Sequence, residues 1–291
     1  MKVLVTGGAG FIGSHLVEAL LARSHEVAII DDFNDFYNPA TKQQNVAGVR
    51  NRAHVYSRDI CDEAGVRAVF ADFAPETVIH LAARAGVRPS VVHPEWYLKT
   101  NIFGTYNLLA AARDQGTVRF IFASSSSVYG ASREVPFRED QALVQTFSPY
   151  ASTKLAGEHL CSNYAHLYGL KVACLRFFTV YGPRQRPDLS IHKFTRLIAQ
   201  GKPIEVYGDG SARRDFTYVE DIVQGVIAAL DYDATGFEVF NLGENATIDL
   251  LSVIRLIEEA FEKKAEIQFL PPMPGDMPQT YADISKARAL L

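Results

Sequence analysis

A tyrosine and a lysine stand four positions apart in the segment Tyr150-Ala-Ser-Thr-Lys154, where a helical pattern begins. In a helix this spacing puts the phenol and the ammonium group on one face. A neighbouring ammonium ion lowers the pKa of a phenol, which makes its phenolate usable as a general base. Such a pair also occurs by chance on protein surfaces, so its meaning depends on the motifs around it.

A glycine-rich turn offers a place for a dinucleotide. The run TGGAGFIG at residues 6–13 follows a short apolar stretch and precedes a helical pattern. Glycines permit the tight turn, and the N–H groups at the helix start meet a pyrophosphate. Asp31, at the end of the next predicted strand, is placed to bind ribose hydroxyls and to repel a 2′-phosphate. The sequence therefore predicts NAD rather than NADP.

Four consecutive serines, residues 124–127, lie at the end of the fifth predicted strand and precede Val128-Tyr-Gly. Ligands of open parallel sheets bind at the carboxyl ends of the strands. The serine hydroxyls are therefore placed to bind sugar oxygens. The alternative is that they only satisfy the hydrogen bonds of a polar loop.

The elements that must position these groups alternate between strands and helices. The strand patterns are Lys2–Thr6, Glu26–Ile30, His54–Ser57, Thr77–Leu81, Arg119–Ser124 and Lys171–Arg176. The helical patterns between them are Gly13–Ala22, Asp62–Phe73, Glu95–Arg113 and Pro149–Tyr168. This alternation predicts an α/β fold with a doubly wound parallel sheet, that is, a Rossmann fold.

The regular alternation of predicted strands and helices ends after residue 176. Residues 1–176 are predicted to form the NAD-binding domain, with later segments at about 215–245 returning to it. Residues 177–291 are expected to form mainly a smaller, interleaved α/β domain for the substrate. Its predicted helices and strands are Ile191–Gln200, Val219–Leu230, Leu250–Glu262, Ile204–Tyr207 and Glu238–Leu242.

Composition excludes several classes of protein. The chain has 291 residues, of which 48% are hydrophobic and 21% charged, values typical of globular domains. We expect no transmembrane helix and no signal peptide. A net charge of −4 without a basic block argues against nucleic acid as a partner. Cys61, Cys161 and Cys174 form no metal or disulfide pattern, so we expect no metal and a cytoplasmic location.

Together these motifs resemble the extended short-chain dehydrogenase/reductases, the class of NAD-dependent nucleotide-sugar epimerases and dehydratases. The matching segments are TGGAGFIGSHL at 6–16, HLAA at 80–83, ASSSSVYG at 123–130, YxxxK at 150–154 and RRDFTYVED at 213–221. The resemblance implies that NAD contacts Gly7, Gly10, Phe11, Ile12, Gly13, Asp31, Asp59, Ile60, Leu81, Ala82, Ala83, Asn101, Tyr150 and Lys154.

The resemblance also implies a reaction. Tyr150 would take the proton of a sugar 4-hydroxyl while C4 gives hydride to NAD, Lys154 would hold the nicotinamide ribose, and Ser125 would bind O4. The 4,6-dehydratases carry Asp-Glu where Ser126 and Ser127 stand, and the decarboxylases carry Glu at the second of these positions. Without those acids, the resemblance favours epimerisation at C4 through a 4-keto intermediate.

Two residues indicate the sugar. The segment RFFTVYGP at 176–183 is similar to UDP-glucuronate 4-epimerases, whereas UDP-glucose 4-epimerases carry Asn where Thr179 stands. Arg186 matches a family arginine that binds the uronate carboxylate through two parallel hydrogen bonds. UDP-glucose 4-epimerase and UDP-glucuronate decarboxylase remain alternatives. A non-catalytic NAD-binding sensor is a more remote one, because a fold alone does not fix a function.

Four more residues are implied as contacts of the UDP-sugar, with solvated side chains as the alternative: Arg88 near the sugar or diphosphate, Arg214 on the phosphates, and Lys193 and Asp276 at the nucleotide.

The family also implies a homodimer that pairs two long helices, about residues 89–113 and 149–168. An apolar stripe fits this role but equally fits packing on the sheet: Leu155, Leu160, Tyr164 and Leu167. Finally, Ser24 stands where a left-handed residue is expected after the first helix, at a small cost in stability.

Overall fold

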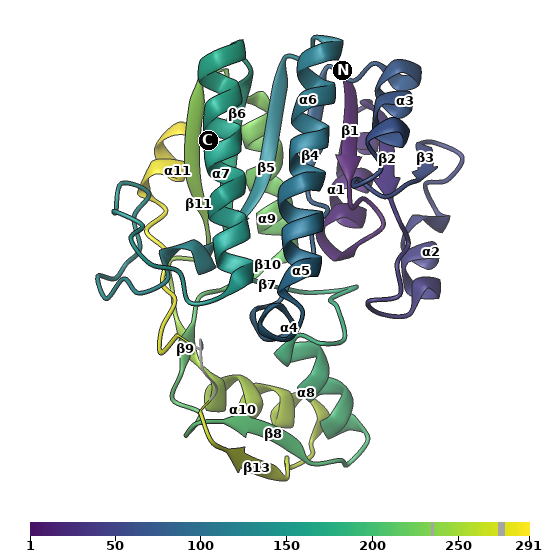
Figure 1. The fold of residues 1–291 in the computed structure, drawn as a ribbon. Helices are drawn as coiled ribbons and strands as arrows, with labels where there is room; N and C mark the ends of the chain where they lie inside the picture. Colours follow the sequence, from purple (N-terminus) through teal and green to yellow (C-terminus); the bar gives the residue numbers. More distant parts are fainter. Residues whose placement is uncertain (234–235, 273–276) are drawn as a thin grey trace.

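The computed structural model describes residues 1–233, 236–272 and 277–291. Its centre is a seven-stranded sheet with the order β11-β6-β5-β4-β1-β2-β3, in which all neighbours are parallel (Figure 1). The strands are β1 (Lys2–Thr6), β2 (Glu26–Asp31), β3 (His54–Ser57), β4 (Thr77–His80), β5 (Arg119–Ser125), β6 (Lys171–Phe177) and β11 (Phe237–Leu242). This confirms the predicted doubly wound α/β fold.

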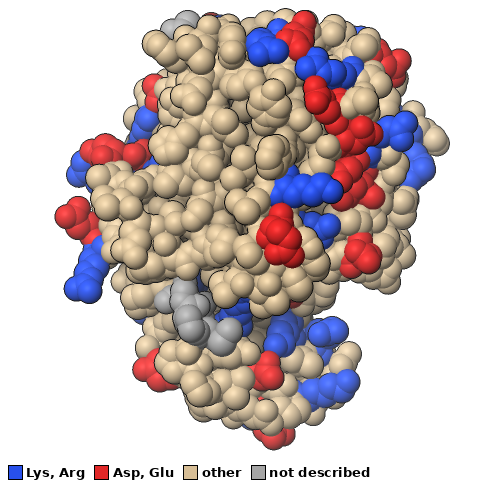
Figure 2. Space-filling model, viewed as in Figure 1, with Lys and Arg blue, Asp and Glu red and all other residues tan. Residues whose placement is uncertain are grey.

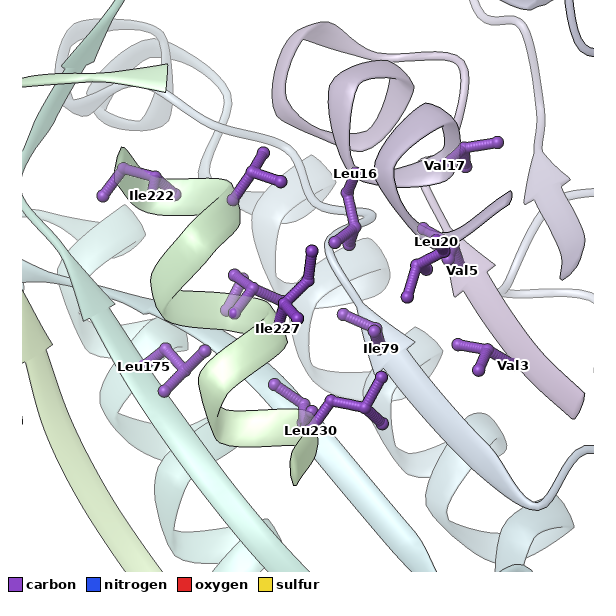
Figure 3. Close-up of a cluster of buried hydrophobic side chains, with 14 of the residues drawn as sticks. Val3, Val5, Leu16, Val17, Leu20, Ile79, Leu175, Ile222, Ile227 and Leu230 are labelled. Carbon is purple, nitrogen blue, oxygen red and sulfur yellow. The ribbon is translucent and has the colours of Figure 1, made fainter. Parts of the chain in front are cut away.

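Helices cover both faces of the sheet, which explains why its central strands are continuous apolar runs. Helices α1 (Phe11–Ala22) and α9 (Val219–Asp231) pack together on one face. Figure 3 shows Leu16 and Leu20 of α1 and Ile227 of α9 directed toward the sheet strands. Three helices cover the other face: α3 (Glu63–Phe73), α6 (Thr105–Gln115) and α7 (Pro149–Tyr168).

A smaller lobe lies below the sheet in Figure 1. It contains α8 (Ser190–Ala199), α10 (Leu250–Phe261) and the parallel pair β8 (Ile204–Tyr207) and β13 (Ile267–Leu270). These elements share their own apolar cluster, which includes Phe194 of α8. Since α9 and β11 return to the sheet between α8 and α10, the smaller lobe is interleaved with the sheet, as predicted.

Several short elements were not predicted, because they offer too few residues for a periodic pattern. They are α2 (Pro39–Ala47), α4 (Val87–Val92), a 3₁₀ turn (Ser126–Tyr129), β7 (Thr179–Tyr181), β9 (Arg213–Arg214), β10 (Phe216–Tyr218), β12 (Ile248–Asp249), β13 (Ile267–Leu270) and α11 (Ser285–Leu290). Helix α2 does carry a start signal that we overlooked: Asn38 caps it by accepting from the Ala40 N–H at 3.0 Å, and Pro39 occupies its first turn.

The helix predicted over Glu95–Arg113 is not continuous. It consists of α5 (Pro94–Tyr97), a π-helical segment (Leu98–Gly104) and then α6. Gly104 fits closely against Ile60, whose Cδ1 would lie 2.5 Å from a Cβ atom at position 104. Hydrophobic periodicity does not separate an α-turn from a π-turn, so the sequence prediction missed this segment. Such π-turns are frequent at functional sites.

Local chemistry fixes the ends of the two helices that matter most for the site. Helix α7 begins at Pro149 after Ser148, whose hydroxyl accepts from the Ala151 N–H at 3.2 Å. Ser24, after α1, has a φ of 60°, so the predicted left-handed residue is confirmed.

Among the described residues, no helix combines the length and the apolar character that a membrane crossing requires.

The order of the strands also locates the site. The chain runs outward from β1 through β2 and β3, then returns to the other side of β1 at β4. At such a reversal the loops after neighbouring strands separate and leave a crevice at their carboxyl ends. The glycine-rich turn after β1 and the serines that end β5 both lie at this edge.

Candidate active site

The glycine-rich turn places backbone without side chains at the carboxyl edge of the sheet. Gly7 has a φ of 70°, and a Cβ atom there would lie 2.8 Å from the Ala82 nitrogen. A Cβ atom on Gly13 would lie 2.2 Å from the Gly7 carbonyl oxygen. Gly10 caps α1, whose first N–H groups have no acceptor within the helix. The turn therefore fits a pyrophosphate, which needs close backbone approach and free N–H donors.

Asp31 ends β2 as a buried carboxylate beside this turn. One of its oxygens accepts from the Ala9 N–H at 3.1 Å and the other from the Phe33 N–H at 3.0 Å. Burial raises the pKa of Asp31, and the charge of Lys42 opposes that shift. A carboxylate has about four acceptor sites, so Asp31 retains capacity for ribose hydroxyls.

Sequence reasoning missed Lys42, on α2. Its ammonium group is buried and lies 3.7 Å from Asp31 and 3.8 Å from Asp32. It also faces the ring of Tyr37, at 5.3 Å from the ring centre. All four side chains line the same cavity. A lone lysine in an unpredicted helix gave no signal, although the cap at Asn38 would have revealed the helix.

One cavity of about 450 Å³ connects the glycine turn with the serines and Tyr150. It gathers most of the residues predicted for the site. They are Gly7, Gly10, Phe11, Ile12, Gly13, Asp31, Asp59, Ile60, Leu81, Ala82, Ala83, Ser125, Ser126, Ser127, Tyr150, Lys154, Thr179 and Arg186. Its size falls in the range of small-molecule and cofactor sites.

Asn101 stands behind the cavity wall and is not among the lining residues. Its side chain accepts from the Arg84 N–H at 2.8 Å and donates to the Arg84 carbonyl at 3.0 Å. A third bond, at 3.0 Å, runs to the hydroxyl of Thr153 on α7. Asn101 thus fixes the main chain of Arg84, which does line the cavity, and ties it to the helix of Tyr150.

Tyr150 and Ser125 meet inside the cavity, where the two side chains are hydrogen-bonded. Burial raises the pKa of the Tyr150 phenol, while the Ser125 bond and the charge of Arg186 act in the opposite direction. We expected Lys154 to supply that opposing charge. The cation whose charge lowers the pKa of Tyr150 is instead Arg186, because Lys154 is directed elsewhere.

Lys154 donates to the Ala123 carbonyl of β5 at 2.7 Å. It is completely enclosed, and this burial lowers its pKa to about 8. One turn further along α7, the buried Glu158 accepts two hydrogen bonds from Arg176 of β6, at 2.9 and 2.8 Å. Ser124 donates to the same carboxylate at 2.5 Å. Ser124 is therefore committed to this network, which joins α7 to the sheet.

Arg186 reaches the cavity from the loop between β7 and α8. Its guanidinium group lies 5.5 Å from the ring centre of Phe36 and pairs with Asp188. Burial lowers the pKa of Arg186, but the hydrogen bond and charge of Asp188 outweigh it and raise that pKa overall. Arg186 therefore places a permanent positive charge close to the Tyr150 phenol.

Three predicted substrate contacts are not among the residues lining the main cavity. Arg88 stacks on Tyr207 of the smaller lobe at 4.1 Å, Lys193 donates to Glu205 at 3.0 Å, and Arg214 donates to the Arg213 carbonyl at 2.9 Å. Figure 2 shows lysines and arginines around the junction of the two lobes, a favourable setting for an anion. Asp276 lies outside the described residues.

Among the described residues, no group of three or more His, Cys, Asp or Glu side chains is placed to hold a metal ion. His80 is buried between the hydroxyls of Thr6 and Thr105, at 2.7 and 2.9 Å. Burial lowers its pKa to about 3, so it is a neutral structural residue.

Comparison with known proteins agrees with this geometry. Residues 3–243 match the NAD dependent epimerase/dehydratase family. The chain belongs to this family. It is 42% identical to a UDP-glucuronate 4-epimerase of Thermodesulfobacterium geofontis, over 99% of the chain and 89% of that protein. The family is NAD-dependent, and the cofactor of this chain is accordingly NAD.

Two solved structures of epimerases are close to the fold described above. One is UDP-glucuronic acid 4-epimerase from Bacillus cereus in complex with UDP-glucuronic acid and NAD, with a TM-score of 0.93 and 39% identity over 100% of this chain and 93% of that one. The other is UDP-glucose 4-epimerase from Thermus thermophilus in complex with NAD, with a TM-score of 0.90 and 36% identity over 99% and 92%.

Proposed function

We propose that this NAD-dependent enzyme epimerises UDP-glucuronate at C4, giving UDP-galacturonate. The observation that carries the proposal is the position of Arg186, whose cationic side chain enters the cavity that holds Tyr150 and Ser125. A guanidinium group binds a carboxylate through two parallel, charge-assisted hydrogen bonds. A uronate whose C4 faces Tyr150 carries its carboxylate on C5, one carbon away from the reacting centre.

The same geometry supports roles for the residues around C4. Bound NAD supplies a reversible hydride acceptor. Tyr150 takes the proton of the 4-hydroxyl and later returns it, and Ser125, hydrogen-bonded to Tyr150, holds the sugar O4. Lys154, close to the end of β5, binds the nicotinamide ribose. Rotation of the 4-keto sugar between the two transfers presents its other face and inverts C4.

The side chains beside C4 favour epimerisation over other outcomes. Ser126 and Ser127 line the cavity at the start of the 3₁₀ turn, and neither side chain is a carboxyl group that could drive dehydration. A 4-keto uronate is a β-keto acid and loses CO₂ when its carboxylate bond stands perpendicular to the ketone plane. Arg186 protects the intermediate by holding the carboxylate away from that alignment.

We assign the two lobes as follows. Residues 1–176, with the returning segments at about 215–245, bind NAD, and residues 177–291 mainly bind the nucleotide sugar. Arg88, Lys193 and Arg214 lie outside the main cavity and are proposed to meet the UDP group at the lobe junction. The three cysteines are free thiols, which supports a reducing, cytoplasmic location.

Substitution of Arg186 tests the proposal. Arg186→Met is expected to lower kcat/KM for UDP-glucuronate about 100-fold, because hydrogen bonds to charged groups contribute about 1.5–3 kcal/mol each. Proton NMR of the reaction should also reveal UDP-pentose from the unprotected intermediate. Equal turnover of UDP-glucuronate by wild type and variant, or UDP-glucose as the preferred substrate of the wild type, would contradict the assigned substrate.

A further inference from the structure

The carboxylate of Asp188 occupies one edge of the Arg186 guanidinium group. Arg186 donates from Nε to one Asp188 oxygen at 3.0 Å and from Nη2 to the other at 2.8 Å. Asp188 keeps 40% of its side chain exposed, whereas Arg186 keeps 19%. The pair therefore has a solvent-facing acid and an arginine that is turned toward the cavity.

A guanidinium group has five N–H donors, and a side-on carboxylate uses the one on Nε and one of the two on Nη2. Both Nη1 donors and the second Nη2 donor remain. Two of these, one on Nη1 and one on Nη2, point along the end of the group, where a second carboxylate can bind with two parallel hydrogen bonds. Asp188 and a substrate carboxylate can thus bind Arg186 at the same time, on different edges.

The backbone makes the Arg186–Asp188 geometry stiff. Pro187 lies between the two residues, and the Leu189 N–H donates to the Arg186 carbonyl at 3.2 Å, which closes a β-turn. Proline in this position presets the backbone of such a turn. The turn leads directly into α8 at Ser190, and the Phe36 ring contacts the guanidinium group from the cavity side.

We propose that Asp188 is a positioning residue that selects uronate substrates by holding the guanidinium plane of Arg186 so that its free end faces the carboxylate. This inference rests on the proposed function. A long, flexible arginine loses side-chain entropy when it binds a ligand. Asp188 and the Pro187 turn already restrict the Arg186 side chain in the free enzyme, so less side-chain entropy is lost when the substrate binds. This smaller entropy loss strengthens the binding only of a ligand that has a carboxylate.

The test compares binding of two ligands to the NAD-loaded enzyme by calorimetry. UDP-glucuronate has the carboxylate, and UDP-xylose is the same nucleotide sugar without it. Asp188→Ala is expected to weaken UDP-glucuronate about tenfold or more, the order of one charge-assisted hydrogen bond, and to leave UDP-xylose within about twofold. Asp188→Asn, which retains one acceptor, should lie between wild type and Asp188→Ala.

The chain provides a matched control. Arg138 and Asp140 form the same side-on pair at the same spacing, through Nε at 3.0 Å and a second bond from Nη2, but on an exposed loop. Asp140→Ala is expected to change the affinity of neither ligand. A tenfold loss in this variant too would mean that disturbed folding explains the result, and would overturn the proposal.

The remaining outcomes are equally decisive. Tighter binding of UDP-glucuronate by Asp188→Ala would mean that Asp188 competes with the substrate, and equal losses for both ligands would mean a purely structural role. Either result overturns the inference while the proposed function stands. If the wild type itself binds UDP-glucuronate no better than UDP-xylose and does not epimerise it, the proposed function fails before any variant is considered.

Discussion

At the scale of single residues, the proposed reaction depends on the phenol of Tyr150, whose burial disfavours its charged form. Burial raises the pKa of Tyr150, and Ser125 and Arg186 only partly oppose this shift. We predict that Tyr150→Phe lowers kcat about 10²–10⁴-fold, the usual contribution of a positioned acid–base group. NAD affinity, measured by fluorescence titration, should change little. A variant that keeps full turnover would contradict the assignment of Tyr150 as the base.

A second prediction concerns the effect of the buried Lys154 on how the free energy of unfolding depends on pH. Its pKa is about 8 in the folded protein, against 10.5 as its ordinary value. Between these values the unfolded chain binds more protons than the folded protein, so the free energy of unfolding rises with pH. Lys154→Met lacks this contribution. Urea unfolding should therefore show the wild type gaining stability relative to Lys154→Met between about pH 8 and 10. Parallel pH curves would contradict the assigned burial.

The sequence indicated which residues lie in the candidate site better than it indicated which other residues they contact. Types and spacing indicated Tyr150, Lys154 and Asp31, because their chemistry is carried by short motifs. They did not indicate that Asn101 lies behind the wall or that Lys42 pairs with Asp31, since both depend on contacts between distant segments. Asp188 stands two residues after Arg186 in the sequence, but its proposed role depends on which edge of the Arg186 guanidinium group its carboxylate occupies.

At the scale of elements, the turn between β1 and α1 leaves little room for added side chains in the proposed cofactor site. A methyl group on Gly13 would meet the Gly7 carbonyl oxygen at 2.2 Å, so the turn would have to open. We expect Gly13→Ala to weaken NAD binding by more than about tenfold, or 1.4 kcal/mol. Gly48→Ala is the control, because nothing lies within 4 Å of a Cβ atom there. Equal NAD affinity in both variants would contradict this geometry.

Several regular elements were predicted well, short strands among them. The bounds of β1, β3, β8 and α7 agree with the expected ranges residue for residue. Interruptions were not predicted: the helix expected over Glu95–Arg113 contains the π-helical segment that carries Asn101. The segment ends at Gly104, which packs closely against Ile60 from a distant part of the chain, a contact that no local pattern records.

At the scale of the whole molecule, we expect a homodimer. The stripe predicted on α7 faces largely inward, since Tyr164 is buried and Leu155 and Leu160 are packed against the core. A group of exposed apolar side chains comes instead from the segments before and within α6 and from the end of α7: Val91, Val92, Trp96, Leu98, Phe103, Tyr106, Leu167 and Tyr168. Figure 2 shows few charges over the face formed by α6 and α7. A patch of this kind commonly marks an interface.

Light scattering tests the dimer. The wild type should have twice the 32.2 kDa mass of the chain. Phe103→Glu should shift the protein toward the monomer, because it places a charge at one of the most exposed apolar side chains of this group. Leu256→Glu, at a similarly exposed apolar site on α10 of the smaller lobe, should not. A wild type that remains at 32.2 kDa would exclude the dimer.

The central claim is inversion at C4 by removal and return of the same hydride. It is tested most directly by incubating the NAD-loaded enzyme with UDP-glucuronate in D₂O and following the products by proton NMR. We predict UDP-galacturonate that retains protium at C4, because the hydride never exchanges with solvent. Deuterium at C4, or failure to form UDP-galacturonate, would contradict the proposed mechanism.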